Sequence, residues 1–292
     1  MIAEDVLDVN GVGPDAGGVL ERVAAPAGSA LPLPCMLVVL AHPDDEVLAM
    51  GGRLERMKAS RLVCVTDGAP VDGGDARAHG FGSLEAYRAA RREELRAALR
   101  LGGVPEECAG ELLVDGRVLS DQTAALHLVE LTRAVLAEIE RFGPEAVLTH
   151  PYEGGHPDHD ACAFAVWAAV RLMGDGERPV VVEAPFYFAG PGGMETGEFL
   201  PGLGDEAEVV WELSEEEQRQ KRERLACFGS QQETLRQFGV ERERYRVSRG
   251  YDFLRAPQDG RLFYEGFGWG MTGERFRELA GLALIALGLD CR

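Results

Sequence analysis

Two short segments of this 292-residue chain bring histidine and carboxylate side chains together. The first is the run His-Pro-Asp-Asp-Glu from His42 to Glu46, and the second is the run His-Pro-Asp-His from His156 to His159. Two imidazoles and one carboxylate are a common ligand set for a catalytic zinc ion that keeps water in its fourth position. Groups that do not bind the metal are then available for proton transfer. Together the two segments predict a hydrolytic metal site.

The spacing within each segment indicates which side chains could bind the metal and which could act on the reacting groups. Asp44 and Asp45 are adjacent, so their side chains point in different directions, and one can bind metal while the other faces the reacting water as a base. His156 and His159 are three residues apart and lie on the same side if a helix begins there. One of them can bind metal while the other reaches the reacting carbonyl oxygen. Asp158 can fix an imidazole tautomer through a hydrogen bond.

The elements around these segments predict where they meet. Apolar runs at 37–40 and 146–148 read as buried strands, and each segment directly follows one of them. Ligands in open α/β sheets bind at the carboxyl ends of the strands. From Met36 onward strands and helices alternate, which predicts an α/β fold with a mostly parallel, Rossmann-like sheet and helices on both faces.

The expected elements can be given by their residue ranges. Strands are predicted at 36–40, 62–66, 112–114, 146–148, 180–183 and 209–211. Helices are predicted at 47–59, 83–101, 121–141, 159–173, 214–228 and 274–287, with a polar, glycine-rich loop at 69–82. The sequence further predicts an irregular N-terminal arm at 1–30 and a single domain at 31–292, whose C-terminal, substrate-side extension covers about 184–270.

Composition excludes several classes of function. Thirty Lys and Arg against forty-nine Asp and Glu give a formal charge of −19, which opposes binding to nucleic acid or to anionic membrane surfaces. Six scattered cysteines form no Cys-x-x-Cys pair, which argues against a disulfide framework or a thiolate metal site. No apolar run approaches the roughly 20 residues of a spanning helix, and no secretory signal is visible. We therefore expect a cytoplasmic protein without membrane insertion; a homo-oligomer stays open.

The two segments resemble a known family. Residues 41–46 (Ala-His-Pro-Asp-Asp-Glu) with the downstream His-Pro-Asp-His are similar to the LmbE-like (PIG-L) zinc-dependent N-deacetylases. That family includes N-acetylglucosaminyl-phosphatidylinositol deacetylase and the deacetylases of mycothiol and bacillithiol synthesis. The resemblance covers about residues 36–232 and continues through Thr66-Asp67-Gly68, Arg91-x-x-Glu94-x-x-x-Ala98, Gly103-Val104, Asp115-Gly116, Lys221 and Ser230-Gln231.

The resemblance implies a specific reaction and ligand set. The chain would remove an N-acyl group, N-acetyl in the family, from a small amino sugar conjugate by attack of zinc-bound water on the amide. One Zn²⁺ per chain, with Fe²⁺ or Co²⁺ as alternatives, would be bound by His42, Asp45 and His159. Asp44 would be the general base. His156 would stabilise the oxyanion, and Asp158 would orient His156.

Three further residues are weaker candidates for substrate binding. The resemblance places Arg91 and Asp115 near the sugar hydroxyls. Taken from the residues alone, Arg91 also fits a helix-surface ion pair with Glu94, and Asp115 fits a plain Asp-Gly turn. His150 ends the strand before the second segment and is within reach of the site. The family often has a histidine just before Ser-Gln, whereas Phe228-Gly229 stand there in this chain, so any role of that histidine is absent.

Two alternatives from other classes stay open at this point. Two histidines and a carboxylate also describe the iron site of non-haem oxygenases, although those sites usually lie in β-barrels rather than in alternating βα units. The chain could also be a metabolite-binding protein with a structural metal and no turnover. The sequence specifies neither the aglycone nor the acyl group of a substrate.

Overall fold

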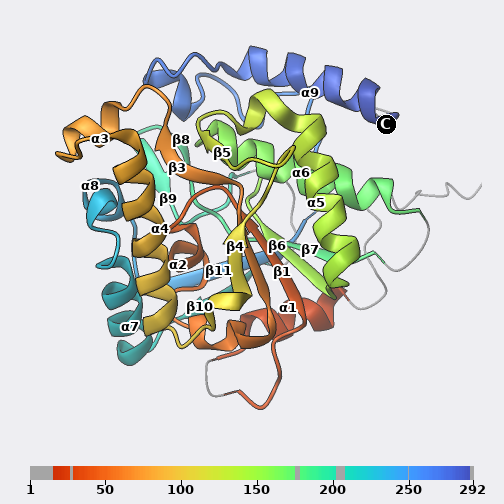
Figure 1. Ribbon diagram of the computed structural model, residues 1–292. Helices are drawn as coiled ribbons and strands as arrows, with labels where there is room; N and C mark the ends of the chain where they lie inside the picture. Colours follow the sequence, from red (N-terminus) through yellow and green to blue (C-terminus); the bar gives the residue numbers. More distant parts are fainter. Residues whose placement is uncertain (1–15, 27–28, 175–177, 202–207, 249, 290–292) are drawn as a thin grey trace, which may run out of the picture.

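The computed structural model describes residues 16–26, 29–174, 178–201, 208–248 and 250–289 (Figure 1). Within this described part the centre is a seven-stranded sheet. Five neighbouring strands pair in parallel, and two further strands pair antiparallel at one edge of the sheet. The order is β10 (Val209–Glu212), β11 (Arg242–Val247), β7 (Val180–Glu183), β6 (Ala146–Thr149), β1 (Met36–Leu40), β2 (Arg61–Cys64) and β4 (Ala109–Glu111).

Smaller elements complete the fold. One parallel pair joins β3 (Thr66–Pro70) to β5 (Leu119–Asp121), and one antiparallel pair joins β8 (Tyr187–Gly190) to β9 (Gly193–Thr196). The α-helices are α1 (Ala16–Ala24), α2 (Asp45–Met50), α3 (Gly74–Ala78), α4 (Leu84–Leu101), α5 (Leu128–Phe142), α6 (Pro157–Leu172), α7 (Glu215–Leu225), α8 (Gln232–Leu235) and α9 (Gly273–Leu287). Short 3₁₀ turns are η1 (Leu54–Ala59), η2 (Glu106–Cys108), η3 (Ala124–His127), η4 (Gly229–Gln231) and η5 (Phe263–Gly266).

Both faces of the sheet are buried. Along β1, Leu37 and Val39 face one core, whereas Met36, Val38 and Leu40 face the other. Residues of α5, α6 and α9 build the first core, and residues of α1, α2, η1, α4 and α7 build the second (Figure 1). A strand buried on both faces reads as a continuous apolar run, as β1 does. The predicted α/β class, with a mostly parallel sheet between helices, is confirmed.

The N-terminal stretch contains a helix where the sequence predicts an irregular arm. Tertiary packing explains the difference, because α1 lies against β10 and β11 and buries one side there. A short Gly- and Ala-rich segment forms a stable helix only with such support. The prediction is therefore wrong for residues 16–24, while 1–15 and 27–28 lie outside the described residues. The buried side of α1 consists of Val19, Leu20, Val23 and Ala24.

Glycine and side-chain burial explain two other differences. The helix predicted at 47–59 is divided into α2 and η1 at Gly51 and Gly52, because glycine weakens a helix and a Cβ at Gly52 would lie 2.8 Å from Leu213. The strand predicted at 112–114 is instead β4, three residues earlier. Leu112 and Val114 are buried, so their apolar character marks core packing, and Val114 pairs only in an isolated bridge with Arg117.

The sequence pattern also failed to predict short elements that have no clear hydrophobic period. The predicted loop at 69–82 holds the end of β3 and the helix α3. The helix predicted from residue 121 begins only at Leu128, after β5 and η3. A three-residue strand is too short for alternation to be read. The second of these differences matters for the site, because it changes where Asp121 points.

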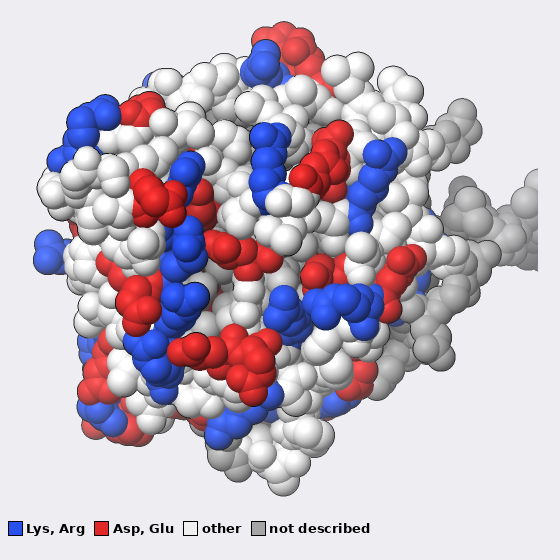
Figure 2. Space-filling model, viewed as in Figure 1, with Lys and Arg blue, Asp and Glu red and all other residues white. Residues whose placement is uncertain are grey.

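The face shown in Figure 2 carries both signs of charge. Acidic and basic side chains alternate there rather than separating into patches. Ion pairs along and beside α4 contribute to this pattern, among them Arg92 with Glu111 and Arg100 with Glu93. Exposed pairs of this kind contribute little to stability, because water and salt screen them. On this face the net negative charge of the chain therefore forms no single acidic surface.

The C-terminal end of α2 is held by polar side chains from distant elements. Nζ of Lys221 donates to the carbonyl of Leu48 at 2.8 Å, and the hydroxyl of Tyr245 donates to the carbonyl of Ala49 at 2.9 Å. The last carbonyls of a helix lack partners within the helix, so these donors satisfy them. Because α2 begins at Asp45, this anchoring also fixes the segment in which the predicted metal ligands lie.

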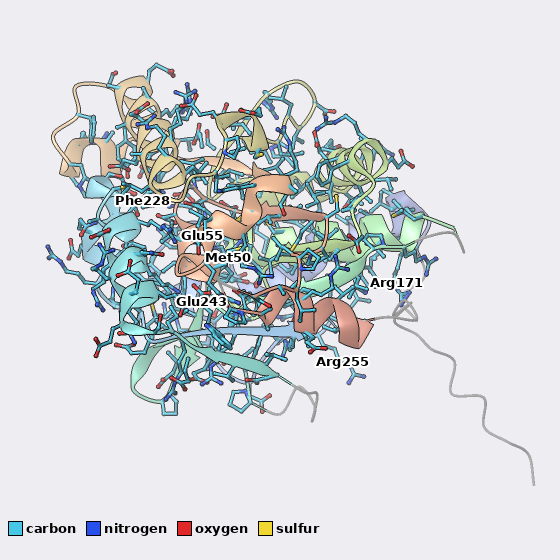
Figure 3. All side chains as sticks on the ribbon, turned by 90° about the horizontal axis from the view of Figure 1, so that it is seen from below. Met50, Glu55, Arg171, Phe228, Glu243 and Arg255 are labelled. Atoms are coloured by element: carbon cyan, nitrogen blue, oxygen red, sulfur yellow. The ribbon has the colours of Figure 1, made fainter. Side chains whose placement is uncertain are left out.

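A buried carboxylate balances the cations of this anchor. Glu243 of β11, labelled in Figure 3, lies 3.0 Å from Nε of Arg53 and 3.3 Å from Nζ of Lys221. It also accepts a hydrogen bond from the backbone N–H of Gly52 at 2.8 Å. All three ionic side chains are almost fully buried. The group therefore links β11 and α7 to the turn that follows α2.

Candidate metal centre

The predicted site lies at the carboxyl ends of two adjacent strands. β1 and β6 are parallel neighbours, and both run into their motifs at the same edge of the sheet. His42 follows β1 by two residues, while His156 caps the start of α6. The helix then places His159 in its first turn. Sheet pairing thus brings together two segments that are more than one hundred residues apart in the sequence.

The three predicted metal ligands form one group. Donor atoms of His42, Asp45 and His159 all lie within 4.8 Å of one another. Nδ1 of His42 is 3.5 Å from Oδ2 of Asp45, and Nε2 of His159 is 3.6 Å from Oδ1 of the same carboxylate. Ligand atoms around one tetrahedral zinc ion are separated by roughly 3.3 Å, given bond lengths of about 2.0–2.1 Å. These spacings suit a single small divalent cation.

The electrostatics of the group also suit a cation. Burial alone would raise the pKa of Asp45, but the imidazoles of His159 and His150 outweigh it and hold that pKa well below its usual value. Burial, reinforced by His150, lowers the pKa of His159 well below 6.5, so its ring is neutral and its lone pair is free. An ionised carboxylate beside a neutral imidazole is the protonation state that metal binding requires.

The pKa of His42 indicates that its surroundings favour a positive charge. Burial would lower its pKa, but Asp121, Asp158 and Asp45 together raise it well above 6.5. Nε2 of His42 lies 3.1 Å from Asp121 and 3.4 Å from Asp158, on the side of the ring opposite to Asp45. The cluster therefore favours a bound cation, and a divalent metal ion would answer the same demand. A second candidate donor group, which shares His42, consists of His42, Asp121, His156 and Asp158.

His150 lies beneath the ligands rather than at the surface of the site. Its side chain is fully buried, and its Nε2 accepts a hydrogen bond from the backbone N–H of Ala41 at 2.9 Å. Its ring stacks on His159 with centroids 3.9 Å apart, and Nε2 is 3.4 Å from Oδ2 of Asp45. The expected contact with substrate is opposed by this burial. The structure instead places His150 as a support for two of the predicted ligands.

The backbone of Asp44 has a strained conformation, which requires support from its neighbours. Its φ of 120° lies in the region that favours glycine, and such strain concentrates at functional sites. Its backbone N–H donates to Oε2 of Glu46 at 3.0 Å, and its carbonyl accepts from the N–H groups of Val47 and Leu48. Burial raises the pKa of Asp44 to about 6, although Arg91 opposes the shift. Asp45 and His42 also influence this pKa, so the carboxylate lies within electrostatic reach of the predicted ligands.

Arg91 is buried against Asp44 and does not lie on the helix surface. Its Nη2 donates to Oδ2 of Asp44 at 3.0 Å and to the carbonyl of Pro43 at 2.6 Å. Its ion pair with Glu94, at 3.5 Å, is present as well. Gly68 permits this packing, because it has a φ of 64° and a Cβ there would lie 2.8 Å from Nε of Arg91. The structure thus joins Arg91 to the predicted base rather than to open space.

Asp158 and His156 are neighbours, but not in the predicted way. The carboxylate of Asp158 accepts hydrogen bonds from the backbone N–H groups of Gln122 at 2.6 Å and Ala124 at 2.9 Å, and lies 4.0 Å from Nδ1 of His156. It is the backbone N–H of Asp158 that donates to Nδ1 of His156, at 3.1 Å. The orientation of His156 therefore comes from the start of α6. The carboxylate itself fixes the turn after β5.

Asp121 is a site residue that the sequence does not reveal. It ends β5, and its Oδ1 lies 3.1 Å from Nε2 of His42 and 3.5 Å from Nε2 of His156. Burial would raise its pKa, but His42 and His156 outweigh this and lower the pKa well below its usual value. Because the sequence predicts a long helix from residue 121, Asp121 would be expected only to cap the start of that helix. The parallel pairing of β5 with β3 is what directs it inward.

Asp115 lies on the surface of the protein. It stands in an exposed turn, with a φ of 50°, between the bridged residues Val114 and Arg117. Among the described residues, the group that meets around His42 does not include it. The Asp-Gly turn that its sequence also suggested describes this geometry. A contact between Asp115 and a sugar hydroxyl stays a prediction that the structure does not support.

Sequence comparison gives one family. Residues 37–170 match the family model PIG-L, GlcNAc-PI de-N-acetylase. The chain is 33% identical over 153 residues to the probable N-acetyl-alpha-D-glucosaminyl L-malate deacetylase 2 of Bacillus cereus, covering 50% of this chain and 65% of that protein. It is 32% identical over 166 residues to the 1D-myo-inositol 2-acetamido-2-deoxy-alpha-D-glucopyranoside deacetylase of Rhodococcus erythropolis, covering 49% and 55%. The matches thus span less than two thirds of these relatives.

Comparison with solved structures supports the fold. A teicoplanin deacetylase, solved in a zinc-inhibited form, has a TM-score of 0.50 at 19% identity, covering 73% of this chain and 98% of that one. A deacetylase of the pseudoaglycone of an antimicrobial reagent has a TM-score of 0.54 at 20% identity, covering 75% and 98%. At these identities the likeness is one of fold. Among the described residues, no helix combines the length and the apolar character that crossing a membrane demands.

The resemblance carried by the two histidine segments is thereby confirmed. The matched region contains both segments, and the structure brings three residues from them, one a carboxylate, into a single donor group. Residues 37–170 of the chain form a PIG-L (LmbE-like) family domain.

Proposed function

We propose that the protein is a metal-dependent hydrolase that removes an N-acetyl group from a small amino sugar conjugate. The observation that carries the proposal is the shared donor group of His42, Asp45 and His159, with the carboxylate of Asp44 held beside it by Arg91. We assign the three residues of that group as ligands of one Zn²⁺. When bound, such an ion polarises an amide carbonyl and lowers the pKa of water toward about 7.

Asp44 is the general base in this proposal. Its carboxylate belongs to the same segment as two of the ligands, pairs with Arg91 at 3.0 Å and lies within electrostatic reach of His42 and Asp45. A base in this position takes the proton of the attacking water as the tetrahedral intermediate forms. The same carboxyl group can then return that proton to the departing amine. Arg91 is a positioning residue, because it holds the carboxylate and the strained backbone of the segment together.

His156 is the proposed donor to the carbonyl oxygen of the amide. Its Nδ1 accepts a backbone hydrogen bond, so the proton of the neutral ring sits on Nε2. Burial, with His42 as the next cause, lowers the pKa of His156 to about 4, which keeps the ring neutral at pH 7. Nε2 faces the same cluster as the metal ligands. Removing one such donor from an oxyanion typically lowers kcat by about 10²–10³-fold.

The test uses purified full-length protein loaded with one equivalent of zinc. Acetate release is measured from N-acetylglucosaminides with different aglycones, and bound metal is measured in parallel. Asp44→Asn should keep the metal and lose turnover, whereas His159→Ala should lose the metal. Asp115→Asn makes the same isosteric change in the exposed turn, and it should keep both. Full activity of the Asp44 variant would refute its role, and a loss of activity in the Asp115 variant would restore Asp115 to the substrate site.

The identity of the metal separates this proposal from its alternatives. An iron oxygenase would consume oxygen in step with product and would be inactive with zinc alone. A binding protein with a structural metal would retain N-acetylglucosaminides and never release acetate. The hydrolase requires acetate release without oxygen consumption. Reconstitution with Zn²⁺, Fe²⁺ or Co²⁺, followed by both measurements, decides among the three.

A further inference from the structure

A row of aromatic rings extends from the predicted site to the surface. The ring of Trp269 lies 4.9 Å from that of His156, and Phe267 stacks on Trp269 at 4.7 Å with an angle of 16° between the planes. Phe263 continues the row at 5.1 Å from Phe267 and reaches Tyr187 at 5.6 Å. Ring pairs at such distances attract one another beyond the effect of burying their surface. We call Tyr187, Phe263, Phe267 and Trp269 the aromatic ledge.

The segment that carries the ledge is fastened at both ends. The carboxylate of Glu265 accepts hydrogen bonds from the backbone N–H of Leu262 at 3.0 Å and from that of Gly273 at 2.7 Å. The backbone N–H of Phe263 donates to the carbonyl of Gly154, at 2.9 Å. Gly154 lies two residues before His156 in the sequence. The ledge is therefore attached directly to the loop that carries the predicted oxyanion donor.

The other side of the ledge is equally close to that loop. A Cβ at Gly155 would lie 1.9 Å from the carbonyl oxygen of Tyr187 and 2.9 Å from its ring. Only glycine allows Tyr187 to approach so closely. Tyr187 is also in ring contact with His159, at 5.4 Å. Both ends of the ledge thus touch histidines of the site, and its position relative to them is fixed before any ligand arrives.

The middle of the ledge is open to solvent. Phe267 is 51% exposed, although burial of a phenylalanine side chain usually stabilises a protein. An exposed apolar surface beside a predicted active site is typical of a binding surface. The ring segment 263–269 lies outside residues 37–170, which the family model matches. The family match therefore does not include it.

We propose that the aromatic ledge binds an aromatic ring in the aglycone of the substrate. This inference rests on the proposed deacetylase function and names the class of conjugate on which the enzyme acts. A flat ring of the aglycone packs on Phe267 and Trp269 while the N-acetyl sugar occupies the metal centre beside His156. A polar aglycone would lose hydration of its hydroxyl or carboxyl groups against these rings without gaining hydrogen bonds in return.

The experiment compares phenyl, cyclohexyl and methyl N-acetylglucosaminides, each as both anomers. With zinc-loaded wild-type protein, we expect kcat/KM for the phenyl glycoside to exceed that for the methyl glycoside by about tenfold. The cyclohexyl glycoside should lie between them, because it is apolar but not flat. Phe267→Ala should reduce the ratio of phenyl to methyl toward one. Leu282→Ala, which removes an exposed apolar side chain from α9, should leave the ratio at its wild-type value.

A binding measurement separates this inference from the proposed function. Calorimetry with the deacetylated phenyl and methyl glycosides reports the ledge without any turnover. Equal kcat/KM for phenyl and methyl substrates would overturn the aromatic ledge and leave the deacetylase intact. If no acetate is released but the phenyl glycoside still binds about tenfold more tightly, and does so only with Phe267 present, the deacetylase is refuted and the ledge is supported. Equal binding of both glycosides would overturn the ledge in either case.

Discussion

Nη2 of Arg91 lies 3.0 Å from Oδ2 of Asp44 and, from the same nitrogen, donates to the carbonyl of Pro43 at 2.6 Å. On its other side, Nη1 is 3.4 Å from Oγ of Ser230. One guanidinium thus connects the proposed base and its backbone to the turn after α7. Because the plane of a guanidinium is rigid, the carboxylate is held in one orientation.

Arg91→Lys should impair turnover without removing metal. An ammonium keeps the charge, but it cannot reach both the Asp44 side and the Ser230 side. We expect kcat for acetate release to fall by about tenfold or more, while bound zinc stays at one per chain. Arg92→Lys, on the next position of α4, alters only surface pairs with Glu85 and Glu111 and should match the wild type. Loss of zinc from the Arg91 variant would show that Arg91 supports the ligands rather than the base.

His150→Phe should weaken metal binding without touching a ligand. Phenylalanine keeps a ring against His159 but cannot accept the hydrogen bond of the Ala41 N–H, and an unsatisfied buried donor costs about 1–3 kcal/mol. Loss of partners behind metal ligands typically lowers metal affinity by about 10–100-fold. Competition with a chelator measures the change. His79→Phe, in an exposed loop, is the control, and equal zinc affinity in both variants would remove His150 from the metal site.

Local signals predicted part of the fold well. Ser83 begins α4 as its cap, and Ser214 with Glu217 forms the capping box of α7, because each signal lies within four residues of sequence. The strands β1 and β6 were predicted from their apolar runs. The shared position of the two motifs followed, since parallel neighbours carry their loops at one edge. The meeting of the two segments could therefore be anticipated from the strand pattern, whereas the choice of His42, Asp45 and His159 as ligands came from the family resemblance.

The remaining parts of the site depend on contacts that no local pattern records. Asp121 enters the site because β5 pairs with β3, and both strands are too short to show a period. Arg91 faces inward because Gly68 leaves room for it, which cannot be read from the helix alone. His150 supports the ligands from below through stacking with His159. In each case tertiary packing decides the role, and residue type alone allows several.

Gly155→Ala should disrupt the site through the backbone. The added Cβ would lie 1.9 Å from the carbonyl oxygen of Tyr187, and a backbone atom cannot move away as a flexible side chain can. We expect a loss of about 1–3 kcal/mol in the free energy of unfolding, the usual cost of overpacking, and at least a tenfold loss of kcat. Urea denaturation and acetate release measure the two effects. Gly192→Ala, with open space around its Cβ, should be neutral in both, and a neutral Gly155 variant would contradict the close approach.

Glu243→Gln should destabilise the fold strongly at neutral pH. The change keeps the shape of the side chain but leaves Arg53 and Lys221 buried without a counter-charge. Removing one partner of a buried ion pair costs about 3–5 kcal/mol. The free energy of unfolding at pH 7, from urea denaturation, is the measurement. Glu212→Gln, which removes the carboxylate of an exposed pair with Arg242 on the neighbouring strand, should change it by less than about 1 kcal/mol.

The same carboxylate predicts how stability depends on pH. Burial would raise the pKa of Glu243, but Lys221 and Arg53 outweigh it and lower the pKa below 4.5. A carboxyl group with a lower pKa in the folded state stabilises the fold above its unfolded value, and this contribution disappears as the pH falls through the folded pKa. The wild type should therefore lose its advantage over Glu243→Gln below about pH 4.5. A stability difference that stays constant from pH 7 to acid would show that the negative charge of Glu243 is not what secures the end of α2.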